Sequence, residues 1–313
     1  MPPRPLENIL VIKLGALGDL VQAMGPARAI RQHHRQARIT LLTTAPYEML
    51  GRAAPYFDDV WIDARPSPWR DPCALWRFRA RLRAARFDRV YDLQTSDRSS
   101  FYRSLFWPGP IPEWSGIARG ASHPHANPER DFIHTIERQR DQLKFAGIDD
   151  VAMPDLSWLD ADLSGLFLPE TGYVLLVPGG AAHRPDKRWP IASYAALAAD
   201  LAARGLQPVI LGGAIERDLA SEIVAAAPSA LDLTGRTDFA MIAALARKAR
   251  HAVGNDTGPM HLIAATGCPA TVLFSSASDP EITRPRGADV TVLRRERLAD
   301  LSPAEVAARL RLG

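Results

Sequence analysis

Short apolar runs alternate with helical patterns twice along this 313-residue chain, and this alternation most constrains its fold. In the first half, the predicted strands are residues 8–13, 37–43, 60–63 and 89–93, and the predicted helices are 20–32, 73–85 and 131–146. In the second half, the predicted strands are 173–177, 208–211, 230–233, 249–253 and 270–274, and the predicted helices are 191–204, 216–227, 239–250 and 302–312. Alternating elements of these lengths predict α/β architecture with parallel, doubly wound sheets.

The two halves are predicted to be separate domains. Residues 147–171 interrupt the alternation and are predicted to be a linker. We expect an N-terminal Rossmann-like domain over residues 1–160, a C-terminal one over residues 170–300 and a closing helix within 301–313. Because such domains bind ligands at the carboxyl ends of their strands, we expect a cleft between them. The aromatic- and proline-containing residues 94–130 are predicted to be irregular, as functional segments often are.

The composition excludes several classes of protein. A net charge of +3 is no nucleic-acid signature, and Cys73 and Cys268 lie too far apart for a metal-ligand pair. No apolar run approaches the ~20 residues that a membrane span needs, and the first residues lack the apolar core of a signal peptide. We therefore expect a soluble cytoplasmic protein in a reducing compartment, without bound metal and without a nucleic-acid partner.

The sequence GNDTGPMH at residues 254–261 joins a predicted strand to a predicted helix. The free N–H groups and the dipole of a helix N-terminus attract anions. Asp256 and Thr257 are predicted to cap this helix, and Gly258 leaves room for a ligand to approach closely. The segment therefore predicts a phosphate cradle, with His261 about one turn further along.

The sequence KLGALGD at residues 13–19 follows the first predicted strand. One interpretation is a glycine turn that presents Asp19 as a general base, near a helix N-terminus that favours a carboxylate. The other is an ordinary Asp19 helix cap, and the residues alone leave both open. The G-x-x-G spacing differs from the G-x-G-x-x-G dinucleotide fingerprint, which argues against an NAD-dependent oxidoreductase.

Three further candidates each allow a structural interpretation. The loop at residues 178–190 would bring Lys187 to a phosphate with Trp189 packed beneath, or would be a solvated basic loop. Glu216, just beyond a predicted strand, would bind ribose hydroxyls or satisfy a helix dipole. His134 and Arg138, four residues apart on a predicted helix, would bind an anion or form an ordinary exposed pair.

Residues 75–87 are rich in arginine, with Arg at positions 77, 79, 81, 83 and 86. Such a helix can lie on an anionic membrane surface. It can equally cover a sheet and present a basic outer face to solvent.

Four segments together resemble glycosyltransferase family 9, the ADP-heptose–lipopolysaccharide heptosyltransferases of Gram-negative bacteria. They are KLGALGD at 13–19, DKRWP at 186–190, GGAIE at 212–216 and GNDTGPMH at 254–261. The resemblance implies a GT-B fold, in which two Rossmann-like domains face each other across a cleft. It also implies inverting, metal-independent transfer of a heptose or related sugar from an ADP-sugar donor to a lipopolysaccharide core acceptor. That acceptor is lipid-linked, which is compatible with peripheral contact with the inner membrane.

The resemblance also implies roles for individual residues. Asp19 matches the catalytic base, and Lys187 matches the lysine at the donor diphosphate. The other implied donor-binding residues are Glu216 at the ribose, Met241 near the adenine, and Asp256, Thr257, Gly258 and His261 at the phosphates and sugar. The implied acceptor-side residues are Lys13, Gly15 and Gly18 in the turn, with His134 and Arg138 near acidic acceptor groups.

One departure from the family concerns the loop before Lys187. Family members often carry hydroxyl residues there, whereas this chain has Ala181, Ala182 and His183. Backbone N–H groups or His183 would replace those contacts, so the exact donor stays open. Two other functions also stay open: another nucleotide-sugar enzyme on the same fold, with a different donor or an epimerase activity, and a non-catalytic nucleotide-binding module.

Overall fold

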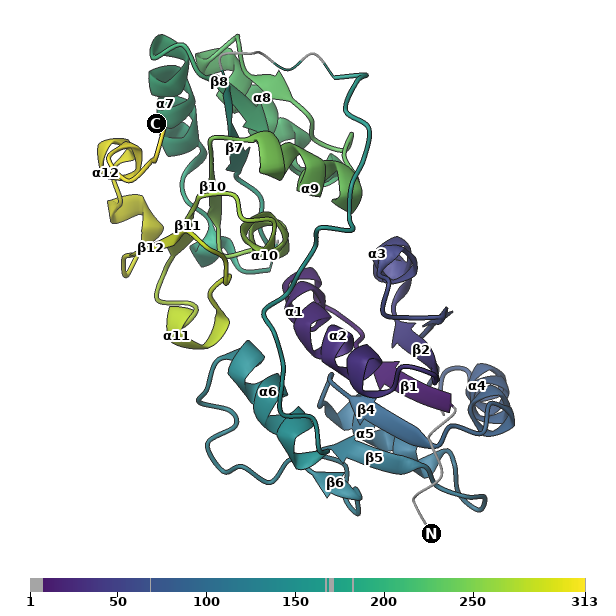
Figure 1. Ribbon diagram of the computed structural model, residues 1–313. Helices are drawn as coiled ribbons and strands as arrows, with labels where there is room; N and C mark the ends of the chain where they lie inside the picture. The colour runs from purple at the N-terminus through teal and green to yellow at the C-terminus, as the bar shows by residue number, and fades with distance from the viewer. Residues whose placement is uncertain (1–7, 68, 167, 169–171, 182, 313) are drawn as a thin grey trace. The chain divides into compact units, whose positions relative to one another are not determined.

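The computed structural model describes residues 8–67, 69–166, 168, 172–181 and 183–312. The chain divides into two compact units, Met1–Pro154 and Asp155–Gly313, and each is described by itself (Figure 1). Both contain a parallel sheet flanked by helices, which confirms the predicted doubly wound α/β class.

In the first unit, the described residues form a six-stranded sheet in the order β3-β2-β1-β4-β5-β6. The strands are β1 (Asn8–Ile12), β2 (Arg38–Thr43), β3 (Asp59–Ile62), β4 (Arg89–Asp92), β5 (Glu113–Gly116) and β6 (His123–Pro124). The helices are α1 (Leu17–Gln22), α2 (Met24–His33), the 3-10 helix η1 (Ala45–Tyr47), α3 (Glu48–Ala53), α4 (Pro72–Ala84), α5 (Asp97–Ser104) and α6 (Thr135–Phe145). This strand order reverses between β1 and β4, and ligands of such sheets bind at that switch point.

In the second unit, the described sheet has the order β12-β11-β10-β7-β8-β9. Its strands are β7 (Tyr173–Val177), β8 (Gln207–Ile210), β9 (Leu231–Asp232), β10 (His251–Asn255), β11 (Ala270–Phe274) and β12 (Val290–Arg294). Its helices are α7 (Ile191–Ala203), α8 (Arg217–Ala226), α9 (Phe239–Lys248), α10 (Gly258–Ala265), α11 (Pro280–Thr283) and α12 (Pro303–Ala307), with 3-10 helices η2 (Pro185–Lys187), η3 (Ala214–Glu216) and η4 (Leu298–Asp300). Counted along its own chain segment, this unit repeats the order of the first, and its switch point lies between β7 and β10.

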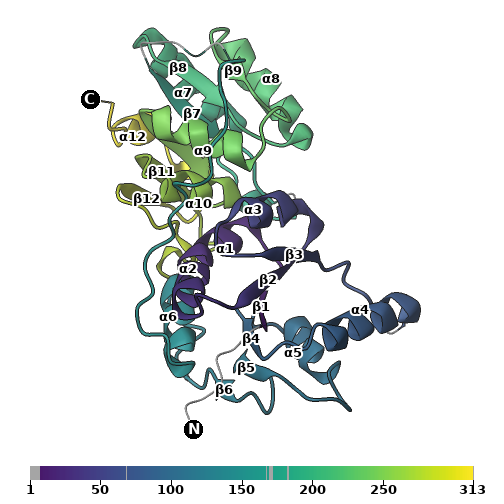
Figure 2. The ribbon, with the colours of Figure 1, turned by 45° about the vertical axis from the view of Figure 1, so that its right-hand side comes forward.

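Strand β1 explains how the first unit is layered. Ile9 and Val11 join one core cluster, while Leu10 and Ile12 join another, because successive side chains of a strand point to opposite faces. Helices α2 and α6 contribute to the first cluster and α4 and α5 to the second (Figure 2). A strand covered on both faces is an unbroken apolar run, which is why it is visible in the sequence.

The second unit has a core on one face of its sheet that includes the end of the chain. Buried residues of α7 and α8 share this core with Trp189, Leu301 and Val306. The closing helix therefore packs within this unit. It is shorter than the predicted 302–312 helix, although Ser302 and Glu305 form the expected capping box.

The predicted helix at residues 20–32 is wrong in its bounds. Helix α1 begins at Leu17 and ends at Gln22, and α2 follows after Ala23. The break has a simple cause: Pro26 has no N–H to donate to the carbonyl group of residue 22, so the helical hydrogen-bond pattern is interrupted. As a result, Asp19 lies in the first turn of α1 rather than in the preceding turn.

The prediction that residues 94–130 are irregular is also wrong in part. They contain α5, β5 and β6. The Ser96 hydroxyl caps α5 by accepting from the backbone N–H of Ser99, and Trp114 of β5 is fully buried and pairs with Val90. Helix α6 begins at Thr135, later than predicted, and α3, α11 and β12 were not predicted. None of the helices in the described ranges has the length and apolar character needed to cross a bilayer.

Candidate functional site

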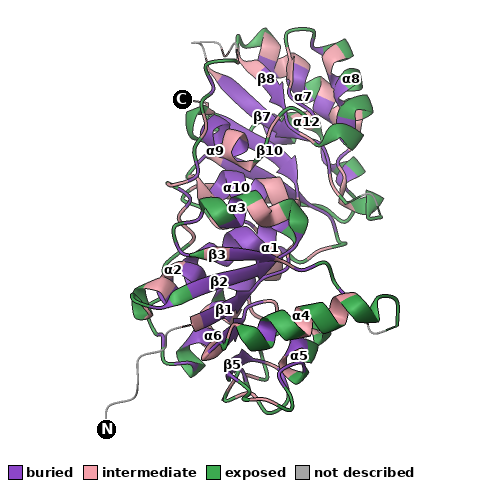
Figure 3. Ribbon diagram, turned by 90° about the vertical axis from the view of Figure 1, so that its right-hand side faces the viewer, coloured by how far each residue is buried: buried purple, intermediate pink, exposed green. Residues whose placement is uncertain are grey.

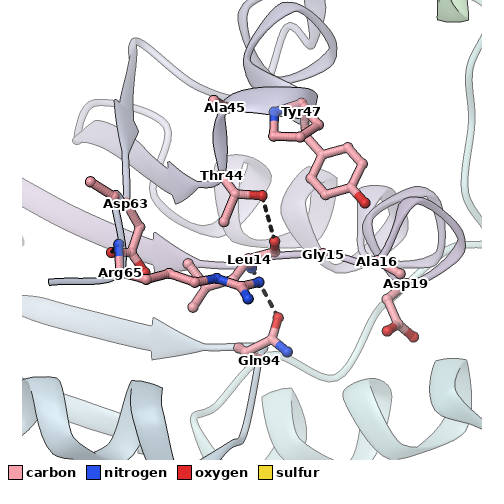
Figure 4. A pocket seen from close by; sticks show the side chains of 12 residues that line it. Leu14, Gly15, Ala16, Asp19, Thr44, Ala45, Tyr47, Asp63, Arg65 and Gln94 are labelled. Carbon is pink, nitrogen blue, oxygen red and sulfur yellow. Dashed lines mark hydrogen bonds between the residues drawn. The ribbon is translucent and has the colours of Figure 1, made fainter. Parts of the chain in front are cut away.

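A cavity of about 740 Å³ opens at the carboxyl end of β1 in the first unit. Its lining comprises Leu14, Gly15, Ala16, Asp19, Thr44, Ala45, Pro46, Tyr47, Asp63, Ala64, Arg65 and Gln94. Asp19 lies toward one end and Arg65 toward the other, with Gln94 between them (Figure 4). The cavity is therefore lined by acidic, basic and amide side chains at the expected switch point.

Hydrogen bonds and a close contact hold the turn after β1 in place. The Leu14 N–H donates to Gln94 Oε1 over 2.9 Å, and Thr44 Oγ1 donates to the Leu14 carbonyl over 2.9 Å. Gly15 has a φ of +124°, and a Cβ there would lie 2.5 Å from Tyr47 Cε2. Position 15 therefore favours glycine for its backbone conformation, and a larger residue would also displace the Tyr47 ring. Gly18 lies inside α1 and is absent from the cavity lining.

Asp19 interacts electrostatically with two cations from different elements. Lys13 is only 4% exposed, and its Nζ donates to the Leu93 carbonyl over 3.2 Å. Burial lowers the pKa of Lys13, and the Asp19 carboxylate opposes that effect. Burial also lowers the pKa of Arg138 on α6, where Asp19 again acts in the opposite direction. The end of β1 and α6 thus place positive charge near the one carboxylate in the first turn of α1.

His134 and Arg138 do not both lie inside the helix. His134 is the N-cap of α6, and its Nδ1 accepts from the Ile136 N–H over 3.2 Å. Its ring is buried, whereas Arg138 is half-buried and pairs with Asp131 at 3.8 Å. The imidazole therefore has a structural role in starting the helix, and Arg138 carries the charge of the pair.

The far end of the cavity contains polar residues that the sequence analysis missed. Asp63 follows β3, and its Oδ2 accepts from the Tyr102 hydroxyl over 2.6 Å, while burial raises the pKa of Tyr102. Asp63 Oδ1 accepts from the Arg65 N–H over 2.7 Å, and Arg65 has a φ of +54°. The Arg65 guanidinium lines the cavity and makes no hydrogen bond or ion pair with any described residue. Because polar residues that follow parallel strands gather at one edge, Asp63 and Arg65 could have been predicted.

In the second unit, Asn255 organises the switch point. It is the last residue of β10 and is fully buried. Its Nδ2 donates to the carbonyls of Pro178 and Gly179 over 2.9 and 3.0 Å. Its Oδ1 accepts from the Trp189 N–H over 2.9 Å and from the Tyr194 hydroxyl over 3.1 Å. These bonds use the full hydrogen-bonding capacity of the amide and attach the loop after β7 to β10.

Lys187 forms an ion pair within this crevice. Its Nζ lies 2.6 Å from Asp256 Oδ2, with side chains 13% and 7% exposed. The interpretation of this segment as a solvated basic loop is therefore wrong for Lys187. Ser278 Oγ also donates to Asp256 Oδ2, over 2.8 Å. The same pairing makes the predicted cap wrong: Thr257 occupies the N-cap of α10 without a side-chain hydrogen bond, and the Asp256 carboxylate accepts from Lys187 and Ser278 instead.

The remaining predicted donor residues lie on neighbouring elements of the same unit. Glu216 is buried, and its Oε2 accepts from the Gly213 N–H over 2.7 Å, which agrees with the helix-end interpretation. Its Oε1 faces Gly179, where a Cβ would lie 3.0 Å away. Met241 is half-buried in the first turn of α9, His261 is buried on α10, and His183 is exposed after β7. The described ranges contain no group of three or more His, Cys, Asp or Glu side chains arranged to hold a metal ion.

The model of one protein family, glycosyltransferase family 9 (heptosyltransferase), matches residues 75–305. The chain belongs to glycosyltransferase family 9. Lipopolysaccharide heptosyltransferase 2 of Salmonella typhimurium is 35% identical over 120 residues, which are 37% of this chain and 34% of that protein. The chain thus matches only about a third of this relative's length.

Two solved structures share the fold along almost their full length. The ADP-heptose lipopolysaccharide heptosyltransferase II of E. coli has a TM-score of 0.79 at 22% identity, covering 96% of this chain and 97% of the other. The E. coli heptosyltransferase WaaC, solved with ADP, has a TM-score of 0.76 at 20% identity, covering 96% and 98%. The expected family and its two-sheet fold are confirmed.

Proposed function

We propose that this family 9 protein is an inverting glycosyltransferase that moves a heptose, or a related sugar, from an ADP-sugar to a lipopolysaccharide core acceptor. The observation that most supports this proposal is the chemical difference between the two switch points. One is a cavity lined by the Asp19 carboxylate, and the other combines Lys187 with the uncapped N-terminus of α10. The names of the relatives, and the ADP in WaaC, support ADP-heptose as the donor.

The second unit is proposed to bind the donor. Lys187 and the Gly258 N–H at the start of α10 would hold the diphosphate, with Gly258 also allowing close approach; Pro259 has no N–H, and the Met260 N–H donates to the Thr257 carbonyl. The diphosphate would compete with Asp256 for Lys187, since both are anions within reach of one ammonium group. Glu216 would bind the ribose, Met241 the adenine, and Thr257 and His261 the sugar. His183 would stand in for the hydroxyl residues that this chain lacks.

The first unit is proposed to bind the acceptor, with Asp19 as general base. Asp19 would take the proton of an acceptor hydroxyl. The acceptor oxygen would then bond to the anomeric carbon while the bond from that carbon to the diphosphate oxygen breaks, and ADP would leave. Lys13, Arg138 and Arg65 supply positive charge for acidic acceptor groups. Gly15 and Gly18 shape the turn, and His134 fixes the start of the helix that carries Arg138.

We expect the transfer to need no metal. Lys187 and the N-terminus of α10 would stabilise the negative charge that develops on the leaving diphosphate. In other enzymes a bound metal ion has this role. We also expect the protein to act at the cytoplasmic face of the membrane, since the proposed acceptor is lipid-linked. Activity that disappears with a chelator and returns with Mg²⁺ or iron would contradict the first expectation.

The first test is nucleotide binding followed by turnover. Thermal stabilisation is measured with ADP, UDP, GDP, CDP and NAD, without metal and then with Mg²⁺. A ligand at about 100 times its Kd adds roughly 2.7 kcal/mol to the unfolding free energy, a readily measured shift. Preferential stabilisation by ADP, with acceptor-dependent release of ADP from ADP-heptose, supports the proposal. Epimerisation without an acceptor, or binding without turnover, would favour the alternative functions.

A further inference from the structure

The outer face of α4 carries a pattern of exposed residues that a helix covering a sheet does not need. Leu75, Phe78 and Leu82 pack toward the core, so the helix does cover the sheet as one interpretation predicted. On the opposite side, exposed residues recur at intervals of three and four and form a single stripe. The stripe consists of Cys73, Trp76, Ala80 and Ala84. An apolar stripe that faces solvent is not explained by the core of this unit.

Arginines flank this stripe on both sides. At 100° per residue, Arg77 and Arg81 lie along one edge and Arg79 and Arg83 along the other, and α4 contains no acidic residue. Two of the four have partners: Arg81 stacks 3.8 Å above the Trp61 ring, and Arg79 donates to the Trp107 carbonyl over 2.6 Å. The side chains of Arg77 and Arg83 make no hydrogen bond or ion pair with any described residue. Their charges are therefore available to a ligand.

Exposed tryptophans lie on the helix and in the segments next to it. Trp69, Trp76 and Trp107 are 92%, 67% and 69% exposed. The bond from Arg79 places the Trp107 segment against α4, and Trp69 lies three residues before the helix. Figure 3 shows α4 as a largely exposed helix with α5 next to it. Large aromatic side chains exposed together mark an interaction surface.

We propose that this docking surface, made of the outer face of α4 with Trp69 and Trp107, binds peripherally to an anionic lipid bilayer. Tryptophan prefers the boundary between headgroups and acyl chains, where its ring is partly apolar and its N–H stays hydrated. Arginines beside an apolar stripe extend their guanidinium groups to lipid phosphates. This proposal rests on the proposed function for its biological reason, a membrane-anchored acceptor, but its physical basis is the helix itself.

A hollow next to the helix fits the same partner. It has a volume of about 800 Å³ at the end of α4, and its lining includes Arg83, Arg86, Asp88 and Phe106. The Asp88 carboxylate accepts from the Asn8 N–H over 2.8 Å. Arg86, like Arg77 and Arg83, has no described side-chain partner. The hollow therefore offers apolar surface with two unpaired cations, the combination that a phospholipid headgroup and its upper chain would occupy.

The test is co-sedimentation of the full chain with vesicles. One set contains phosphatidylcholine alone, and the other contains phosphatidylcholine mixed with phosphatidylglycerol, each at low and high salt. We expect binding to the anionic vesicles at low salt, weakened by high salt. The variant R77E/R83E should bind these vesicles about tenfold less tightly or worse, and W76A should lose affinity at both salt concentrations.

The matched control is R35E/R309E, which makes the same charge change at exposed arginines outside the docking surface. It should bind within about twofold of the unmodified chain. Equal loss in the control, equal binding to uncharged vesicles, or retention of DNA oligonucleotides without vesicle binding would each overturn the proposal. Unchanged thermal midpoints establish that the variants fold.

An activity assay separates this proposal from the proposed function. With a soluble, delipidated acceptor, R77E/R83E should turn over like the unmodified chain, because α4 lies outside the cavity that contains Asp19. Vesicle binding without any transferase activity would refute the proposed function and leave the docking surface standing. Transferase activity with no vesicle binding would overturn the docking surface alone.

Discussion

The two units have the same strand order, but the residues at their switch points are held in place differently. In the second unit, Asn255 makes bonds in four directions, and Lys187 and Asp256 are paired. In the first unit, Gln94 holds one backbone N–H of the turn, and Asp19 and Arg65 line an open cavity. A saturated network positions groups before a ligand arrives, whereas an open cavity leaves its side chains free to meet one. This difference is what the proposed function requires, with the anionic donor in the second unit and the reacting acceptor in the first.

Replacing Asp19 tests the first unit and should have the largest effect. Asp19→Asn keeps the shape of the side chain but removes the base, so kcat should fall by about 10²–10⁴-fold. The affinity for ADP and the thermal midpoint should hardly change, because Asp19 lines only the cavity of the first unit. Steady-state kinetics and calorimetry measure the two quantities. Asp149→Asn, at an exposed aspartate of the same unit, is the control. If Asp19→Asn lost ADP affinity by as large a factor as it lost kcat, Asp19 would not be the general base.

Replacing Asn255 tests whether the second unit depends on its network. Asn255→Ala leaves the Trp189 N–H, the Tyr194 hydroxyl and two carbonyls without this partner. We expect the free energy of unfolding to fall by about 2–4 kcal/mol, because each buried group left unpaired costs about 1–3 kcal/mol and the groups relax in part. Gln94→Ala in the first unit should cost about 1 kcal/mol, because it removes one bond. Urea unfolding compares the two; equal costs would contradict the contrast between the units.

Replacing Lys187 tests the charge in the proposed donor site. A charge-assisted hydrogen bond is worth about 1.5–3 kcal/mol, so Lys187→Met should weaken ADP binding by about 10–150-fold. Asp256→Asn should tighten ADP binding, because it removes the anion that competes for Lys187. Lys248→Met, at an exposed lysine of the same unit, serves as the control. Weaker ADP binding in Asp256→Asn would mean that Asp256 assists the donor, and the model of competition would have to be abandoned.

The sequence predicts regular elements well where the determining pattern is local. Strand β1 and helices α4 and α7 agree with their predicted ranges to within one or two residues, because apolar runs and turn residues lie next to each other in the chain. The break at Ala23 follows from Pro26 and could have been predicted. Strand β5 could not, since only its pairing with β4 makes Glu113–Gly116 a strand.

For the candidate site as well, local patterns predict where the residues lie but not which partners they contact. The predicted motifs lie at the ends of β1, β7, β8 and β10, as strand order requires. The partners of their side chains are long-range: Asp256 meets Lys187 across 69 residues, and Tyr102 meets Asp63 across 39. No spacing rule predicts such contacts. For this reason the sequence pattern predicted Asp256 to be a helix cap and indicated no role for Asn255.

The smallest expected effect is the change in stability at acid pH, and its sign should differ between two buried groups, Asp92 in the first unit and His251 in the second. Burial raises the pKa of Asp92, at the end of β4, to about 6. The folded state therefore binds this proton more tightly than the unfolded state, and the free energy of unfolding rises as the pH falls from about 6 toward 4. Burial lowers the pKa of His251, at the start of β10, to about 4, so its contribution to stability falls as the pH drops from about 6.5 toward 4.

Each slope should disappear in a matching variant. Asp92→Asn should lose the acid-induced gain, while His251→Gln should lose the acid-induced loss, each by up to about 1.4 kcal/mol per pH unit. Urea unfolding of both variants and the unmodified chain between these pH values measures the differences. The Lys13 ammonium favours the Asp92 carboxylate, and the Asp289 carboxylate favours protonated His251, so both neighbours reduce the slopes without reversing them. Slopes of the same sign would mean that burial does not control the pKa of one of these two groups.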